Sequence, residues 1–130
     1  MTSLYYIVPS AKTVADAARD LEAAVQKHGF GVLHVYDLKD TLTRKGYPLG
    51  PQCRIFEVCN PKIAGRVLSA DMRLNMALPC RISVFTEGGQ TKIGLIRPVE
   101  MLSALSPDPT LVDAARDVER ATIAMVDEAR

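Results

Sequence analysis

The chain has 130 residues, of which 48% are hydrophobic and 24% are charged, and its formal net charge is +1. This length fits a single domain over residues 1–130, and the apolar content excludes intrinsic disorder. The 16 basic residues are balanced by 15 acidic residues, so the chain lacks the basic surface that nucleic acids attract and no nucleic-acid partner is expected.

The N-terminus and the cysteines favour a cytoplasmic protein. Residues 1–9 lack the basic segment and long apolar run of a signal peptide, and no stretch approaches the roughly 20 apolar residues of a membrane span. The three cysteines, Cys53, Cys59 and Cys80, cannot all pair within one chain. An exported domain of this size normally carries an even number, so we expect a reducing compartment and no membrane partner.

The N-terminal segment predicts a strand followed by an amphipathic helix. Residues 4–8 are rich in aromatic and β-branched side chains and predict a strand that a Pro-Ser pair closes. A helix is predicted to begin at Thr13, whose hydroxyl can accept a bond from an early backbone N–H. It ends at Gly29, which can adopt the left-handed conformation at low cost.

The central part predicts two more strands with a loop between them. Residues 30–38 carry apolar side chains on both faces, so this strand is expected to be covered on both sides, with a partner chain on one of them. Residues 39–51 contain several Gly and Pro residues and predict a loop with one helical turn near 40–44. The third strand, residues 54–59, ends at Asn60-Pro61, a strong helix start.

The C-terminal half predicts a short helix that fades near Asp71, then a hairpin and further helices. Residues 79–86 and 91–96 pair across a turn that contains two glycines. A brief helix over 98–105 follows, and Asp108-Pro109 opens a last helix to about Glu128. The resulting order β-α-β-β-α-β-β-α predicts the α+β class, with about five mostly antiparallel strands against three main helices.

The thiols form the best candidate site for chemistry. Cys53, Glu57 and Cys59 share one face of the third strand if that strand stays regular. Cys59 also precedes a helix N-terminus, which is expected to lower its pKa. If the third strand pairs with the hairpin, Cys59 and Cys80 come together, with Arg81 as a cationic neighbour. The alternative is that these cysteines are small buried hydrophobic residues.

Three further residues each have two interpretations. Glu57 lies in an otherwise apolar strand and fits either a general base or a dimer-interface residue. His34 fits a metal or acid–base role, or an ordinary histidine of a sheet. Tyr36 fits a ligand cleft or a half-buried strand position. The spacing of the cysteines and histidines does not match a zinc site, so neither a metal nor a cofactor is expected.

Two motifs resemble the family called domain of unknown function 302, small bacterial and archaeal proteins. They are Phe-Glu-Val-Cys-Asn-Pro at residues 56–61 and Leu-Pro-Cys-Arg-Ile at residues 78–82, supported by Gly-Phe-Gly-Val-Leu at 29–33. The resemblance implies an α+β domain with a TATA-binding-protein-like architecture, commonly a homodimer. It transfers no catalytic residues, because the family carries no established reaction. The matching positions are Cys59, Asn60, Pro61, Pro79, Cys80 and Arg81.

Three functional hypotheses follow from these patterns. The first is a non-enzymatic cytoplasmic homodimer that binds a small molecule or a protein through the sheet face without helices. Its expected binding residues are Cys53, His34, Tyr36, Asn60 and Arg81. The second is a thiol-dependent redox or sulfur-handling protein that uses Cys59 and Cys80, assisted by Glu57 or Arg81. The third is a metal or haem site of cysteine with His34. Whether the protein is an enzyme is left open.

Overall fold

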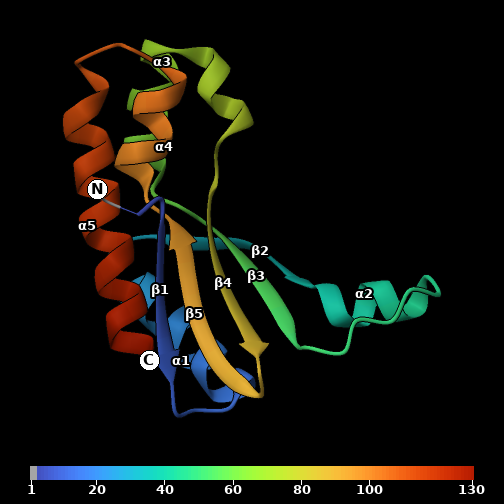
Figure 1. The fold of residues 1–130 in the computed structure, drawn as a ribbon. Helices are drawn as coiled ribbons and strands as arrows, with labels where there is room; N and C mark the ends of the chain where they lie inside the picture. The colour runs from blue at the N-terminus through green and yellow to red at the C-terminus, as the bar shows by residue number, and fades with distance from the viewer. Residues whose placement is uncertain (1–2) are drawn as a thin grey trace.

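The computed structural model describes residues 3–130 and arranges them as an antiparallel sheet with helices against one face (Figure 1). The strand order is β1-β5-β4-β3-β2. The strands are β1 (Tyr5–Ser10), β2 (Gly31–Asp37), β3 (Cys53–Cys59), β4 (Cys80–Glu87) and β5 (Gln90–Ile96). The helices are α1 (Val14–Lys27), α2 (Leu38–Arg44), α3 (Pro61–Ala70), the 3₁₀ helix η1 (Met72–Met76), α4 (Pro98–Leu105) and α5 (Leu111–Ala129). The predicted α+β class is confirmed.

None of the helices within residues 3–130 combines the length and the apolar content that crossing a membrane requires. The prediction that the chain has no signal peptide used residues 1–9. Of these, Met1 and Thr2 lie outside the described residues.

The two best-marked helix starts are confirmed at atomic detail. The hydroxyl of Thr13 accepts a hydrogen bond from the backbone N–H of Asp16 at 3.1 Å. The side-chain oxygen of Asn60 accepts from the backbone N–H groups of Lys62 and Ile63 at 3.1 and 3.3 Å. Both side chains satisfy donors that the first helical turn leaves without partners. Asn60 therefore fixes the start of α3, and so its position above the end of the sheet.

Two element boundaries differ from the prediction by two residues, and most others differ by less. The first strand continues through Pro9 to Ser10, because β1 lies at the sheet edge, where a residue without an N–H is tolerated. The last helix begins at Leu111 rather than at Asp108-Pro109. The Asp108 carboxylate instead accepts bonds from the backbone N–H and the hydroxyl of Thr110, at 2.9 and 2.8 Å, and so forms a turn before the helix.

The predicted loop after the second strand contains a full helix, α2, that projects from the body (Figure 1). Asp37 caps α2 through the backbone N–H of Asp40, and Arg44 pairs with the Asp40 carboxylate at 2.9 Å. These local contacts account for the helix, since none of its residues is buried. The preceding strand β2 is an edge strand with mostly exposed residues, so the chain itself does not supply the cover expected on its two faces.

The core consists of two apolar clusters that lie side by side. The larger cluster fills the space between the helix-covered sheet face and the helices α1 and α5. The smaller cluster joins α3, η1, α4 and the first turns of α5, and it includes Val67, Leu74 and Leu102. Ile63 of α3 packs against both clusters. The junction between the two clusters is where the main cavity forms.

Candidate functional site

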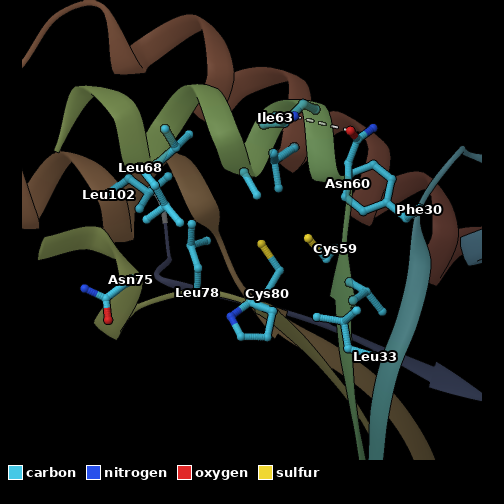
Figure 2. A pocket seen from close by; sticks show the side chains of 15 residues that line it. Phe30, Leu33, Cys59, Asn60, Ile63, Leu68, Asn75, Leu78, Cys80 and Leu102 are labelled. Atoms are coloured by element: carbon cyan, nitrogen blue, oxygen red, sulfur yellow. Dashed lines mark hydrogen bonds between the residues drawn. The ribbon is translucent and has the colours of Figure 1, made fainter. Parts of the chain in front are cut away.

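A cavity of about 230 Å³ opens between the ends of β3 and β4 and the helices above them (Figure 2). The larger cluster contributes Phe30, Val58 and Val118 to its walls, and the smaller cluster contributes Val67 and Leu102. The remaining lining residues are Leu33, Cys59, Asn60, Ile63, Ala64, Leu68, Asn75, Leu78, Pro79 and Cys80. The walls are therefore almost wholly apolar, with two thiols and two side-chain amides as the polar groups.

The register of β3 and β4 brings two of the three cysteines to this cavity. Cys80 lies opposite Val58, the residue that precedes Cys59 in the chain. Figure 2 shows both sulfur atoms at the floor of the cavity, below α3. Glu57 and Cys53 lie on the face of β3 that the helices leave open, whereas Cys59 lines the helix-side cavity. The shared face predicted for Cys53, Glu57 and Cys59 thus does not extend to Cys59.

Burial dominates the acidity of both cavity thiols. Burial raises the pKa of the Cys59 thiol above its usual value. Burial, together with the nearby Cys59 charge, raises the pKa of Cys80 to about 11. The direction is opposite to the lowering predicted for Cys59 from the α3 N-terminus, because burial removes water from the thiolate and disfavours the charged form. Both groups are protonated at neutral pH.

Cys53 lies apart from the cavity. It begins β3, opposite Phe85 of β4, and it is not among the residues that line the cavity. Burial and the neighbouring Asp37 carboxylate raise the pKa of its thiol. The three cysteines of the described chain are free and unequal: two share a cavity and one does not.

Four of the predicted site residues meet on the open face of the sheet. The Tyr36 hydroxyl donates a 2.8 Å hydrogen bond to the Glu57 carboxylate, and the Arg81 guanidinium lies 3.5 Å from the other carboxylate oxygen. His34 contacts the Tyr36 ring edge to face, with ring centroids 4.4 Å apart. The bond to Glu57 also raises the pKa of Tyr36. These side chains form a polar cluster on β2, β3 and β4.

The third hypothesis, a metal or haem site, loses its ligand set in this geometry. His34 contacts Tyr36 and faces the polar cluster, whereas Cys59 and Cys80 line the helix-side cavity. Within residues 3–130 no group of three or more His, Cys, Asp or Glu side chains is placed to hold a metal ion.

A second, broader groove of about 320 Å³ crosses the open face of the sheet beside the polar cluster. Arg81 lies in it, between apolar side chains of the neighbouring strands. Tyr5, Ile7 and Ile96 are each more than 40% exposed there. The open face thus combines exposed apolar groups with an ion pair.

The sequence patterns did not predict a cavity. They gave no sign of its helical wall, which includes Ile63, Ala64, Val67, Leu68 and Leu102. Their helical spacing is the same whether the facing space is filled or empty. The family-like motifs at 29–33, 56–61 and 78–82 did point to this region, because they contribute Phe30, Leu33, Val58, Cys59, Asn60, Leu78, Pro79 and Cys80 to its walls.

Comparison with known proteins identifies relatives of the whole chain. The family model described as Domain of unknown function DUF302 matches residues 6–129. The crystal structure of an uncharacterized conserved DUF302 protein from Bacillus stearothermophilus is 32% identical in sequence, with a TM-score of 0.93. That match covers 99% of this chain and 100% of the Bacillus chain. No curated protein matches the chain.

Proposed function

The chain belongs to the DUF302 family, whose description states no activity, and we propose from the geometry of its main cavity that it is a binding module for a small apolar molecule. The observation that carries this proposal is the cavity of about 230 Å³ with nearly continuous apolar walls. An engineered apolar cavity of about 150 Å³ is large enough to bind benzene. The present cavity therefore has room for a substituted aromatic ring or a short hydrocarbon chain.

The polar groups of the cavity support binding rather than catalysis. The Asn60 side chain already caps α3, and the Asn75 amide donates to the backbone carbonyl of Met72. Both thiols are protonated at neutral pH because burial raises the pKa of each. A bound molecule would thus meet shape and apolar surface rather than an activated nucleophile, acid or base.

An apolar guest would be stabilised by burying its own surface against the apolar lining groups. Val67 and Val58 are almost fully buried in the surrounding clusters, so they cannot move freely to fill the space. An apolar guest fills it without any polar group needing a partner.

The second candidate is the thiol-dependent redox or sulfur-handling function. It is favoured by one observation: Cys59 and Cys80 share the cavity floor. The reactive form of a cysteine is the thiolate, which a raised pKa makes scarce. This function therefore needs a change that deprotonates a buried thiol, and we rank it second.

We further propose that the protein is a homodimer in which a second copy covers the open face of the sheet. Ile7, Tyr5 and Ile96 are exposed on this face. A two-fold interface pairs one surface with itself, so charges on that surface must include both signs to be complementary. The Glu57–Arg81 pair carries both signs. The near-balanced charge of the chain supports a protein partner rather than a nucleic acid.

Thermal unfolding with and without toluene tests the binding function. Toluene is small enough for the cavity, and a ligand that binds only the folded state raises the unfolding midpoint. The variant Ala64→Phe places a ring in the cavity, whereas Ser69→Phe places the same ring on the exposed face of α3. We expect toluene to raise the midpoint of the wild type and of Ser69→Phe but not of Ala64→Phe. Equal behaviour of all three proteins would contradict the proposal.

A further inference from the structure

We propose that Cys59 and Cys80 together form a two-coordinate site for a soft monovalent metal ion, with Cu(I) as the ion whose chemistry the site fits. This inference goes beyond the binding of an apolar molecule and does not rest on it. It concerns the floor of the cavity, whereas the apolar guest is recognised by the walls.

The sheet brings the two thiols to the same cavity. The β3–β4 register places Cys80 across from Val58, so Cys59 lies one residue beyond the position opposite Cys80 on the adjacent strand. Figure 2 shows the two sulfur atoms at the cavity floor with no other labelled side chain between them. Paired strands keep this arrangement without a ligand.

The donor set excludes most metal ions. Among the described residues that line the cavity, none is an Asp, Glu or His. Mg²⁺ and Ca²⁺ require several oxygen ligands, and a structural zinc site requires four donors of the nitrogen, sulfur or oxygen type. Two thiolates without a third strong donor suit a d¹⁰ monovalent ion, which accepts linear coordination, and soft sulfur ligands select Cu(I).

The binding step balances without an oxidant or a reductant. Each thiol releases its proton to solvent, and two sulfur–copper bonds form while copper stays monovalent. The resulting group carries one net negative charge inside an apolar cavity. The N-terminus of α3 begins at Pro61, two residues after Cys59, and its partial positive charge offsets part of that charge.

Soft donors also occur on the segment that borders the cavity. Asn75 and Leu78 line the cavity, and η1 between α3 and β4 carries Met72 and Met76. These methionine side chains are 66% and 82% exposed. Thioethers bind Cu(I) weakly and reversibly, so they provide a first contact for an ion that passes from solvent to the thiols.

The test is an anaerobic titration of the reduced full-length protein with Cu(I) held by a chromophoric Cu(I) chelator. We expect the wild type to withdraw one equivalent of Cu(I) per chain from the chelator. Cys59→Ser and Cys80→Ser should each lower the affinity by more than the roughly 10–100-fold that loss of a supporting outer residue costs. Cys53→Ser is the matched control, because Cys53 lies outside the cavity, and it should bind as the wild type does.

X-ray absorption at the copper edge provides a second readout that does not depend on affinity. We expect two sulfur neighbours around copper in the wild type and in Cys53→Ser. Far-ultraviolet circular dichroism and the unfolding midpoint of each variant show whether it is folded.

The proposal is overturned if the wild type leaves Cu(I) on the chelator. It is equally overturned if folded Cys53→Ser loses as much affinity as Cys59→Ser, because binding is then not located in the cavity. Neither outcome alters the toluene result, which is measured without metal.

Discussion

Cys80 and Cys59 lie on adjacent antiparallel strands at the floor of one cavity, one residue out of direct register, with Val58 opposite Cys80. Their position follows from two local features. The helix start at Asn60 ends β3 directly after Cys59, and β4 begins at Cys80. The two motifs that resemble the family thus meet in space, and both contribute to the walls of the same cavity.

The first prediction concerns the pH dependence of stability. Burial raises the pKa of Cys80 from its ordinary value of 9.0 to about 11 in the folded protein. The unfolded chain therefore loses this proton at lower pH than the folded chain does, so the contribution is present below about pH 9 and is lost as pH rises towards 11. We expect the free energy of unfolding to fall by about 2–3 kcal/mol more in the wild type than in Cys80→Ala over this interval.

Urea unfolding at a series of pH values measures this difference. For each protein the free energy of unfolding is plotted against pH. The difference between the two plots removes the contributions of lysines and tyrosines that titrate in the same interval. Alkylation provides an independent check, since native Cys80 should react far more slowly than the same residue in the unfolded chain at pH 8. If the free energy of unfolding falls with pH equally in the wild type and in Cys80→Ala, burial does not raise the pKa of Cys80.

The second prediction concerns the start of α3. Replacing Asn60 with Ala removes the side-chain acceptor for the N–H groups of Lys62 and Ile63. We expect a loss of about 1 kcal/mol in the free energy of unfolding. Asn60→Asp should restore most of it, because Asp is as good an N-cap as Asn. Chemical unfolding measures both, and an Asn60→Ala protein as stable as the wild type would mean that the cap does not hold α3.

The third prediction concerns the close approach of β1 and β5 at Gly94. A Cβ atom at this position would lie 2.9 Å from Cγ1 of Ile7 and 3.1 Å from the backbone oxygen of Tyr6. We expect Gly94→Ala to destabilise the protein by about 1–3 kcal/mol, the usual cost of overpacking. Gly31→Ala is the control within a strand, since a Cβ there meets nothing within 4 Å. Similar unfolding midpoints for both variants would contradict this account of the β1–β5 contact.

The fourth prediction tests the proposed homodimer. Ile7 is 48% exposed on the open face of the sheet. Leu105 is 52% exposed on α4, which packs against α5, and it does not line the groove of that face. We expect sedimentation equilibrium to give twice the chain mass for the wild type and for Leu105→Lys, and the mass of one chain for Ile7→Lys. A wild-type protein with the mass of one chain would exclude the dimer, and a dimeric Ile7→Lys would place the interface elsewhere.

Local signals explain which parts of the fold could be predicted. Three predicted features depend only on neighbouring residues, and all three are confirmed. They are the starts of the helices at Thr13 and Asn60 and the turn at Gly88 and Gly89. The helix α2 was predicted only as one helical turn near 40–44, because it has no buried stripe and is held by its Asp37 cap and a local ion pair. The strand order was not predictable, because pairing of β1 with β5 brings together segments far apart in the chain.

The candidate site could be predicted only in part for the same reason. The meeting of Cys59 and Cys80 was expected only if β3 paired with the hairpin, and the structure pairs them. The association of Glu57, Tyr36 and His34 required the β2–β3 register, which shifts between Val32 and His34. The cavity itself arises where two apolar clusters fail to merge, and a pattern of apolar residues does not reveal whether a space between them is filled.

A methyl-labelled NMR titration with toluene is the most direct test of the claim that the cavity binds a small apolar molecule. The account predicts saturable shifts of the methyl signals of Ile63, Val67, Leu68, Leu78 and Leu102, which line the cavity. The methyl signals of Ile7 and Ile96 on the open sheet face should stay unchanged. Unchanged cavity signals at saturating toluene, or shifts confined to the open face, would contradict the account.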